Sequence, residues 1–507
     1  MRGVTKTFGA VVANRKVNLE IRRGEILSLL GENGSGKTTL MNMLSGIYFP
    51  DEGEILVDGK QVTIRSPKDA FDLGIGMIHQ HFKLVDVLTA TENILLGLQE
   101  KGSLNLKAAA EKIRQICDKY GFVVDPNKKI YDMSVSEKQT VEIVKVLYRG
   151  ANILILDEPT AVLTPQETQK LFNVMRNMKS DGKAIVIITH KLHEVMEISD
   201  RVAVLRKGEY VGDVATGDTN PQKLTDMMVG HAVTLNIDRP MPVNPVKRLD
   251  VQNLTVKNTY GLKALDNVSF QAYGGEILGV AGISGCGQKE LLEAIAGLQP
   301  IENGGSVRYF PDETSASKEL VGEDPLTIKR MGVSFSFVPE DRLGMGLVGS
   351  MGMTGNMMLR SYRSGKGLFT DRKAPKKLAE DIREQLEVIT PDINTPVRRL
   401  SGGNVQKVLV GREIAAQPKV LMTAYAVRGL DINTSYTIYN LLTEQKMQGV
   451  AVIYVGEDLD VLLELCDRIL VLCGGKVNGI VDARTTTKEE VGLLMTNLQE
   501  KVKEERA

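Results

Sequence analysis

The stretch Gly31-Glu-Asn-Gly-Ser-Gly-Lys-Thr38 decides the fold of this 507-residue chain. It matches the phosphate-loop pattern G-x-x-x-x-G-K-[ST] at every fixed position. A buried strand is predicted just before it, over 25–30, and a helix just after it, over 38–45. Glycines in such a loop let backbone N–H groups close around a polyphosphate, and the helix N-terminus adds its positive dipole end. We therefore predict that the loop binds a nucleoside triphosphate.

Two side chains of the loop have predicted chemical roles. Lys37 is placed to reach the β/γ-phosphate oxygens, and the hydroxyl of Thr38 to hold Mg²⁺. A plain glycine-rich turn with an exposed lysine is the alternative, which the flanking strand and helix disfavour. The nucleotide-binding residues predicted in and beside the loop are Gly31, Asn33, Gly34, Ser35, Gly36, Lys37, Thr38 and Thr39.

Composition is that of an ordinary globular protein. A chain of 507 residues is longer than one hydrophobic core usually supports, so we expect two or more domains. Lys+Arg and Asp+Glu are equal at 63 each, which gives no electrostatic reason to expect nucleic-acid binding. The 4 cysteines lack metal-site spacing and are expected to be reduced thiols in a cytosolic protein. The sequence has no run of 18 apolar residues and no secretory signal, so we expect membrane association only through another protein.

The same sequence pattern occurs twice along the chain. Gly24-Glu-Ile-Leu-Ser-Leu-Leu-Gly31 recurs as Gly275-Glu-Ile-Leu-Gly-Val-Ala-Gly282, and Asp-Arg-Val-Ala-Val-Leu at 200–205 resembles Asp-Arg-Ile-Leu-Val-Leu at 467–472. Such internal repetition indicates a tandem of homologous α/β domains. The predicted divisions are a first domain over 1–237, a short Pro-rich linker over 238–247 and a second domain over 248–507.

Alternation of apolar runs and amphipathic runs in the first half predicts a mostly parallel sheet with helices on its faces. In such sheets, ligands bind at the carboxyl ends of the strands. The predicted elements are strands over 17–21, 25–30, 75–78, 153–156 and 184–189, a hairpin arm over 53–59, a helix start at Ser66-Pro67 and a helical region over 84–131.

With these motifs in place, the whole chain resembles the ATP-binding cassette (ABC) ATPases. More narrowly, it is similar to the double-cassette ATPases of bacterial importers for ribose-type sugars and nucleosides. The resemblance is carried by the phosphate loop, by Gln80 in a Q-loop-like segment, by a Walker B-like strand over 153–159 and by His190 as the switch histidine. It implies a tandem pair of α/β P-loop NTPase domains, each with an inserted helical subdomain, and it implies ATP and Mg²⁺ as cofactors. In that family the two cassettes pair head to tail. A family member normally has a further edge strand before the position of Val4, so we expect the chain to be trimmed at its start.

The resemblance assigns the metal and the general base to particular side chains. Asp157, at a strand end, supplies a carboxylate to the Mg²⁺ shell, together with Thr38 and Gln80. Glu158 is placed to polarise the attacking water as general base. A solvated turn is the structural alternative for the two carboxylates, and a polar loop residue is the alternative for Gln80. We name Glu158, Gln80 and His190 as the predicted catalytic residues.

Two further roles also follow from the resemblance. His190 contacts the γ-phosphate; by itself, a histidine at this position would more often be a surface or capping residue. Phe8 stacks on adenine, with a core phenylalanine as the alternative, because its position is the sole support for the assignment.

The second half departs from the pattern at each position that carries chemistry. Loss of the loop lysine removes a full positive charge from beside a polyanion, and loss of both Walker B carboxylates removes the metal ligand and the base. Together these changes leave no route to hydrolysis in this half. The replaced positions are Gln288 for the lysine, Lys289 for the metal-binding hydroxyl, Ala424 and Tyr425 for the carboxylates, Glu340 for the Q-loop glutamine and Glu457 for the switch histidine.

The signature segments are divided in the opposite way. The second half keeps Leu-Ser-Gly-Gly-Asn at 400–404, whereas the first half has Met-Ser-Val-Ser-Glu at 133–137, without either glycine. A Ser-Gly-Gly alone is as often an ordinary loop. Combined with head-to-tail pairing, the pattern predicts one hydrolytic site, built from 31–190 of one cassette and 400–404 of the other. The predicted nucleotide-binding residues of the signature are Ser401, Gly402 and Gly403.

We predict that the chain couples Mg-ATP hydrolysis at one composite site to uptake of a nucleoside. The segments 78–82 and 84–89 resemble nucleoside-importer ATPases more than ribose or galactose ones, so a sugar importer is the first alternative. A soluble tandem-cassette ATPase in translation or DNA maintenance is the second; the short linker and the lack of basic excess disfavour it. A nucleotide-regulated binding module without turnover is a third class, disfavoured by Glu158.

The resemblance also implies partners and a location. We expect two transmembrane permease subunits and an extracellular solute-binding lipoprotein, with no nucleic acid. The chain would then lie at the cytoplasmic face of the cell membrane and reach the membrane through the permeases alone.

Overall fold

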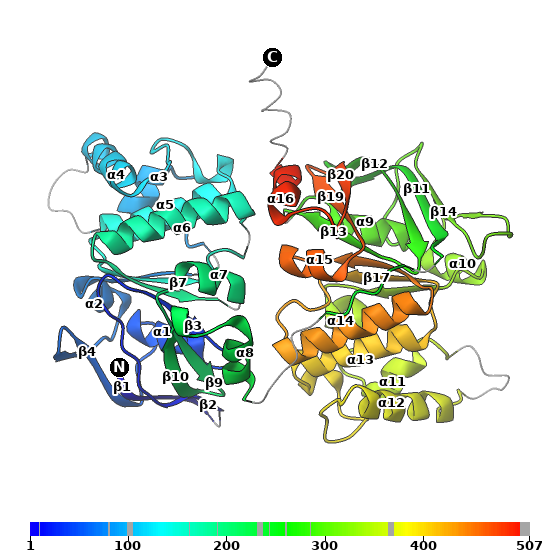
Figure 1. Cartoon of the computed structure of the whole chain (residues 1–507), viewed down its shortest axis with the longest axis horizontal. Helices are drawn as coiled ribbons and strands as arrows, with labels where there is room; N and C mark the ends of the chain where they lie inside the picture. Colours follow the sequence, from blue (N-terminus) through cyan, green and yellow to red (C-terminus); the bar gives the residue numbers. More distant parts are fainter. Residues whose placement is uncertain are drawn as a thin grey trace, which may run out of the picture. The chain divides into compact units, whose positions relative to one another are not determined.

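The computed structural model describes residues 1–9, 11–79, 82–98, 105–161, 163–189, 191–230, 237–242, 244–258, 261–283, 285–362 and 370–496. The chain forms two compact units, Met1–Leu235 and Asn236–Ala507. Each unit combines a smaller antiparallel sheet, a larger sheet and helices (Figure 1). The predictions for Gln80 and His190 lie outside the described residues.

The larger sheet of the first unit is six-stranded, in the order β10-β9-β3-β8-β7-β6. Its strands are parallel except for the antiparallel edge pair β10-β9. Every residue of β3, β6 and β8 is buried, as expected for apolar strands covered on both faces. The predicted mostly parallel sheet is confirmed, with β3 Ile26–Leu30, β6 Ile75–Ile78, β7 Ile153–Asp157, β8 Ala184–Ile188, β9 Arg201–Arg206 and β10 Glu209–Ala215.

The smaller sheet of the first unit has the order β2-β1-β4-β5. The strand predicted over 17–21 is wrong, because β2 ends at Val17. Beyond that residue the Asn18 side chain accepts the Gly3 N–H at 2.8 Å, and the only continuation within the described residues is a backbone pair between Leu19 and Met1, at 2.9 and 3.1 Å, next to the first residue of β1. The bounds are β1 Arg2–Phe8, β2 Val11–Val17, β4 Glu52–Val57 and β5 Lys60–Val62, the last two forming the predicted hairpin.

Among the described helices of the first unit, all except α1 and α7 begin at a polar side chain that accepts one of their first N–H groups. Ser66 forms a capping box with Asp69 and is followed by Pro67, which confirms the predicted helix start. The predicted helical region contains α3 and α4, which pack with α5 around a shared apolar cluster. The helices are α1 Lys37–Leu44, α2 Pro67–Asp72, α3 Ala90–Leu95, α4 Leu106–Tyr120, α5 Val135–Tyr148, α6 Pro165–Ser180, α7 Leu192–Ile198 and α8 Pro221–Val229, with short 3₁₀ turns at Ile130–Asp132 and Thr216–Asp218.

The second unit repeats this topology. Its larger sheet has the order β16-β17-β18-β13-β19-β20, which is the first unit's order read from the β6 edge, with each strand replaced by its counterpart. Its smaller sheet has the order β12-β11-β14-β15. The strands are β11 Val246–Lys257, β12 Lys263–Gly274, β13 Ile277–Gly282, β14 Ser306–Tyr309, β15 Lys318–Glu319, β16 Phe335–Val338, β17 Val420–Ala424, β18 Ala451–Val455, β19 Arg468–Cys473 and β20 Lys476–Asp482.

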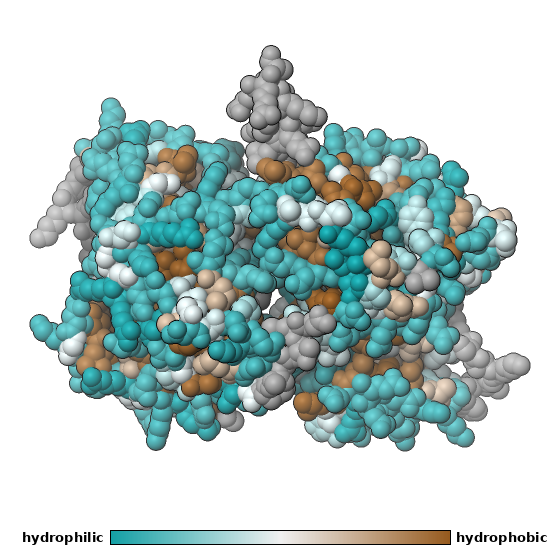
Figure 2. All heavy atoms as spheres, viewed as in Figure 1, coloured by the Kyte–Doolittle hydropathy of each residue, from teal (hydrophilic) through white to brown (hydrophobic). Residues whose placement is uncertain are grey.

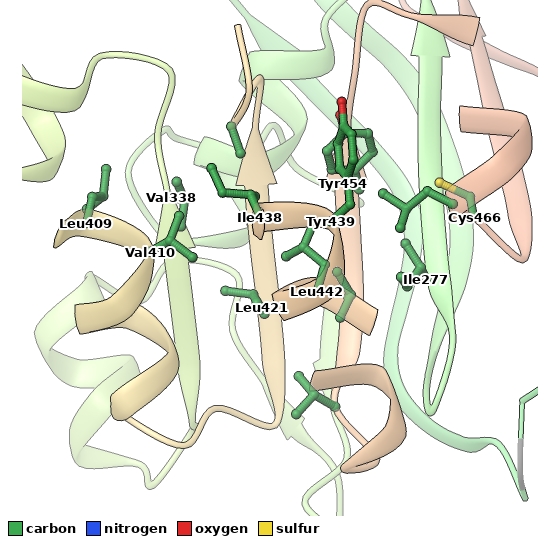
Figure 3. Packing of buried hydrophobic residues seen from close by; sticks show 14 of the residues in the cluster. Ile277, Val338, Leu409, Val410, Leu421, Ile438, Tyr439, Leu442, Tyr454 and Cys466 are labelled. Carbon is green, nitrogen blue, oxygen red and sulfur yellow. The ribbon is translucent and has the colours of Figure 1, made fainter. Parts of the chain in front are cut away.

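Helices cover both faces of this second sheet. On one face, Ile438, Tyr439 and Leu442 of α14 pack on the central strands, and Leu409 and Val410 of α13 lie beside Val338 of the edge strand β16 (Figure 3). The helices are α9 Gln288–Ile295, α10 Pro325–Arg330, α11 Met353–Met358, α12 Lys373–Gln385, α13 Gly402–Ala415, α14 Ile432–Met447, α15 Leu459–Leu465 and α16 Lys488–Thr496, with a π-helical turn at Arg342–Gly346 and a 3₁₀ turn at Val397–Arg399.

Part of the segment that the sequence assigns to a linker is bonded to the second unit. Arg239 Nη1 donates to the Cys466 carbonyl at 2.8 Å. The buried Lys446 ammonium donates to the Pro240 carbonyl at 2.6 Å and pairs with Asp467 at 2.8 Å. These bonds fix the first part of the segment on its own unit.

The surface in Figure 2 is mostly hydrophilic, with separate apolar areas. No helix within the described ranges combines the length and the apolar character that a membrane span requires.

Candidate nucleotide-binding site

The first phosphate loop leaves the buried strand β3 and enters α1 with a conformation that requires glycine. Gly36 is the N-cap of α1 and has φ 93°, in the left-handed region. A Cβ on Gly36 would lie 2.3 Å from the Ala13 carbonyl oxygen, and one on Gly31 would lie 2.3 Å from the Leu205 carbonyl oxygen. The loop is therefore pressed against two neighbouring strands, which leaves no room for a side chain at either glycine.

The Lys37 side chain folds back over this loop. Its ammonium donates to the Gly31 carbonyl at 2.7 Å and to the Glu32 carbonyl at 3.0 Å. Burial lowers the pKa of Lys37, and the charges of Glu158 and Asp157 oppose that shift. A polyphosphate over the loop would add negative charge beside this buried cation and stabilise its protonated form.

Thr38 and Asp157 come together as a pair of oxygen ligands. The Thr38 hydroxyl donates to the Asp157 carboxylate at 3.3 Å. Burial at the end of β7, with the charge of Glu158 next to it, raises the pKa of Asp157 to about 6. The described residues hold no group of three or more His, Cys, Asp or Glu side chains fit to bind a metal ion. This pair fits Mg²⁺, which takes one or two protein oxygens and completes its shell with phosphates and water.

The backbone fixes the position of Glu158. Its φ is 50°, which is unusual for a residue with a side chain, and its N–H donates to the Ile188 carbonyl at 2.8 Å. Tyr425 in the second unit has φ 51° and donates to the Val455 carbonyl at 2.9 Å. The fold therefore imposes the same turn in both halves, and it aims a carboxylate in one and a phenol in the other.

Two buried polar atoms beside the loop have no protein partner among the described residues. They are the Ser35 hydroxyl and the side-chain amide oxygen (Oδ1) of Asn14, both on nearly fully buried residues. A Cβ on Gly31 would lie 2.3 Å from Ser35 Oγ as well as from the Leu205 carbonyl oxygen, so this hydroxyl faces the strand side of the loop. The Asn14 amide donates to the Gly36 carbonyl at 3.2 Å. Sequence reasoning missed Asn14; the repeat aligns it with Leu265, and this polar-for-apolar exchange is the signal that would have revealed it.

Phe8 ends β1 with its ring 43% exposed. The ring packs edge-on against Tyr48, with centroids 5.1 Å apart, and the Lys6 ammonium lies 5.6 Å from its centroid. The core alternative for Phe8 is therefore wrong, and its stacking on adenine stays a prediction. Tyr48, which holds the ring, was not predicted.

The strands bring the predicted chemistry to one edge of the sheet. β6, β7 and β8 pair in register, so Ile78 lies beside Leu156, and Asp157 lies beside Ile188. Strand β3 pairs with β8 in the same direction, with Leu29 opposite Ile188. The phosphate loop, the Walker B carboxylates and the ends of β6 and β8 therefore meet at the carboxyl edge.

The second unit has the same loop without the same charges. Gln288 is buried, and its amide donates to the Ile283 carbonyl at 3.1 Å, in the manner of Lys37 but without a cation. Lys289 is exposed and pairs with Glu293 at 3.8 Å. Burial raises the pKa of Tyr425, and the charges of Glu457 and Glu340 raise it further, so the phenol stays protonated near neutral pH.

The two signature helices begin differently. Ser134 caps α5, and the carboxylate of Glu137 accepts the Ser134 N–H at 2.7 Å. The same carboxylate pairs with the Lys128 ammonium at 2.7 Å, so an ion pair lies at this helix start. Ser401 caps α13, whose first turn has no acidic residue, and both Ser401 and Gly402 are exposed. Only the second of these helix starts presents its N–H groups without a neighbouring carboxylate from its first turn.

Comparison with known proteins agrees with this geometry. The family model described as "ABC transporter" matches residues 14–161 and 265–423. The chain is 43% identical to the nucleoside import ATP-binding protein NupA of Lactococcus lactis, covering 98% of this chain and 97% of that protein. It is 41% identical to the guanosine import ATP-binding protein NupO of Bacillus subtilis, covering 99% and 98%. It is 38% identical to the ribose import ATP-binding protein RbsA 1 of Rubrobacter xylanophilus, covering 98% and 97%.

A solved structure shares the tandem fold. The archaeal ribosome recycling factor aABCE1 in complex with the ribosomal stalk protein aP1 superposes with a TM-score of 0.59, covering 92% of this chain and 87% of that chain at 16% identity. This likeness concerns the fold alone. The family match in both halves and the full-length relatives place the present chain in the ABC transporter family, as an ATPase that uses ATP with Mg²⁺ and carries two cassettes in one polypeptide.

Proposed function

We propose that this chain hydrolyses Mg-ATP at one site, built on the first phosphate loop, and thereby powers the import of a nucleoside. The observation that carries the proposal is the contrast between two equivalent positions in one fold. Glu158 and Tyr425 occupy the same left-handed turn, with φ 50° and 51°, and only Glu158 can accept a proton from water.

The side chains of the first cassette divide the work. Lys37 and the loop N–H groups bind the phosphates, and the exposed face of Phe8 receives the base. Thr38 and Asp157 hold Mg²⁺, which supplies charge neutralisation at the transferring phosphate. Glu158 orients and deprotonates the attacking water. Gln80 and His190 complete the metal and γ-phosphate contacts in this proposal.

The second cassette contributes through its signature. Ser401, Gly402 and Gly403 would donate to the γ-phosphate of the ATP held by the first loop. The N-terminus of α13 supports this role, since its first turn carries no carboxylate. At the corresponding start of α5, the Glu137 carboxylate accepts the Ser134 N–H and pairs with Lys128, and both signature glycines are replaced, which favours the second cassette as the donor.

Similarity to two nucleoside importers supports nucleoside cargo. NupA and NupO, at 43% and 41% identity, are named for nucleoside and guanosine import. The ribose importer ATPase RbsA 1 is 38% identical over the same length, so a sugar is the second candidate cargo. An ATPase subunit does not itself bind the cargo, so the assignment rests on likeness of the whole chain.

Exposed apolar residues support docking to membrane permeases. In the first cassette, Val85 and Val87 are 40% and 67% exposed, just after the Q-loop segment. The fully buried Asn93 holds this segment by accepting the Val85 N–H at 2.8 Å and donating to the Val85 carbonyl at 3.1 Å. Rigidly held, exposed apolar groups are typical of a protein interface.

The second cassette repeats this arrangement. Asn356 accepts the Val348 N–H at 2.8 Å and donates to the Val348 carbonyl at 3.2 Å. The exposed apolar residues around it are Leu343, Met345, Val348, Met351, Leu359 and Tyr362. We propose that each cassette docks one of two permease subunits here, at the cytoplasmic face of the membrane, with an extracellular solute-binding protein delivering the cargo.

The test is a Glu158→Gln variant reconstituted with the permeases and the solute-binding protein in proteoliposomes. The variant should still bind ATP but lose hydrolysis and uptake, because the amide cannot take the proton from water. Uptake of radiolabelled guanosine, adenosine, ribose and galactose is then compared in the wild type. Undiminished ATPase activity in the variant would refute the catalytic assignment. Ribose uptake without nucleoside uptake would show that the cargo is a sugar and not a nucleoside.

A further inference from the structure

An ion-pair cluster joins three neighbouring strand ends in the second unit. Arg428 Nη1 lies 2.6 Å from a Glu340 carboxylate oxygen, and Arg428 Nε lies 3.2 Å from a Glu457 carboxylate oxygen. Glu340 follows β16, Arg428 lies beyond the Tyr425 turn that follows β17, and Glu457 follows β18. These strands are adjacent and parallel, so one guanidinium bridges the carboxyl ends of all three.

The same cluster continues to the signature. Arg342 donates through Nη2 to the backbone carbonyl of Arg428. A Cβ built on Gly402 would lie 3.4 Å from Arg342 Nη1, so the guanidinium rests against the signature backbone. On the other side, a Cβ on Gly403 would lie 3.2 Å from a carboxylate oxygen of Asp431, the N-cap of α14. The signature start is therefore held between Arg342 and the start of a helix.

The repeat gives the first half no equivalent of this cluster. At the positions of Glu340 and Arg342 it has Gln80 and Phe82, and at those of Arg428 and Glu457 it has Ala161 and His190. None of the four is a guanidinium or a carboxylate. The cluster thus belongs to the half that has lost the loop lysine and both Walker B carboxylates.

We propose that Arg428 and Arg342 are positioning residues, which hold the signature loop ready for ATP without any nucleotide in the second pocket. The inference rests on the proposed role of Ser401 to Gly403 in hydrolysis at the first loop. The ion pairs of Arg428 connect the ends of β16, β17 and β18. In a cassette that hydrolyses ATP, the bound Mg-nucleotide would connect the equivalent strand ends.

The exposure of these side chains indicates that their ion pairs fix the position of the signature loop more than they stabilise the folded chain. The side chains of Arg428, Glu340 and Glu457 are 55%, 36% and 44% exposed. Ion pairs at such exposure add little to the free energy of folding. They still restrict where the Arg428 carbonyl, and with it Arg342, can lie.

The experiment measures steady-state ATPase activity of the chain assembled with its permeases, for Arg428→Gln and Arg342→Gln. We expect kcat to fall about tenfold with KM for ATP nearly unchanged, because the first loop is intact while the signature donors are displaced. Arg308→Gln is the matched control: Arg308 is an exposed arginine on β14 that bonds Ser306, and its loss should leave kcat unchanged.

A double-mutant cycle and salt dependence separate positioning from a general structural defect. Glu340→Gln should lower kcat like Arg428→Gln, and the two together should lower it no further than either alone. Arg428→Lys should recover part of the activity. Because partly exposed ion pairs are screened by salt, wild-type kcat should fall as salt rises, whereas that of Arg428→Gln should not. The isosteric Glu340→Gln keeps the test available if the arginine variants fold poorly.

The outcomes distinguish this inference from the function on which it rests. Gly402→Asp, which places a charge at the signature itself, should abolish turnover. If Gly402→Asp retains full activity, the composite site is wrong. If Gly402→Asp is inactive while Arg428→Gln, Arg342→Gln and Glu340→Gln keep wild-type kcat, the positioning role is overturned and the composite site remains.

Discussion

At the scale of single residues, the competent and degenerate halves differ by side chains that the same backbone presents. Lys37 and Gln288 are both buried at the start of the helix after a phosphate loop, and both donate to carbonyls of that loop. The two side chains differ by one positive charge, which Lys37 carries and Gln288 lacks. A neutral amide can close the loop on itself, but it cannot offset the charge of a triphosphate.

Exchanging these residues gives a direct prediction. Lys37→Gln, which installs the residue of the second loop, should weaken ATP binding at least tenfold and abolish hydrolysis, because a buried charge-assisted contact to phosphate is lost. Binding is measured by the fluorescence of a labelled ATP analogue and turnover by phosphate release.

Gln288→Ala is the paired control for this prediction. It alters the same position in the degenerate loop and should leave hydrolysis nearly unchanged. Loss of turnover in Gln288→Ala, with Lys37→Gln still active, would transfer the chemistry to the second loop.

At the scale of elements, one buried carboxylate ties the signature helix of the second unit to its surroundings. Glu413 of α13 is fully buried and pairs with Arg412 at 2.8 Å and with Arg360, while accepting the Phe337 N–H of β16 at 3.3 Å. Burial and the nearby Arg360 lower the pKa of Arg412 to about 10. The carboxylate therefore compensates the buried cation of Arg412 and the partly exposed cation of Arg360.

Removing this carboxylate should destabilise the second unit. Glu413→Leu leaves the two guanidinium groups without their counter-charge, for which we expect a loss of roughly 3–5 kcal/mol in the free energy of unfolding. Denaturant unfolding followed by circular dichroism measures it. Glu384→Leu, on the exposed face of α12, should change the midpoint little; equal midpoints for both variants would contradict the argument.

The exposed segment before α3 carries a prediction about assembly. Val87→Asp places a charge on a 67% exposed apolar side chain and should reduce co-purification with the permease subunits without unfolding the chain. Val123→Asp is the matched control, because Val123 is 88% exposed but lies after α4. Normal recovery of the complex with Val87→Asp would remove this surface from the interface.

At the scale of the whole molecule, the two units are copies in topology and complements in chemistry. One keeps the loop lysine and the proposed general base, and the other keeps a signature helix whose first turn has no carboxylate. Neither half contains a full set of hydrolytic groups in its own sequence. Repair of one half alone should therefore fail to create a second active site.

This can be tested in a Glu158→Gln background, where the first site is silent. Restoring the second loop and strand with Gln288→Lys, Lys289→Thr, Ala424→Asp, Tyr425→Glu and Glu457→His should give no hydrolysis. Adding Val135→Gly, Ser136→Gly and Glu137→Gln, which opens the start of α5, should give measurable phosphate release. Turnover in the repaired variant before the α5 changes would show that an open signature is not required.

The predictions from sequence succeeded where a residue's role follows from its neighbours in the chain. Alternating apolar runs gave β3, β6, β7 and β8, and Ser66-Pro67 gave the start of α2. The strand predicted over 17–21 was wrong: β2 ends at Val17, because its partner β1 begins at Arg2 and leaves only the Leu19–Met1 pair beyond it. The sequence also left the role of Phe8 open, because the residue type alone does not determine whether a phenylalanine is buried or exposed.

The sequence by itself determined the repeat, the family and the asymmetry between Lys37 and Gln288, because motif spacing and charge are written directly in the order of residues. Only the tertiary structure decided which side chains contact one another when they come from distant segments of the chain. Asn14 on the loop, Tyr48 on Phe8 and the Arg428 cluster each join elements far apart in the chain. Such contacts depend on strand register and backbone direction, which no local pattern encodes.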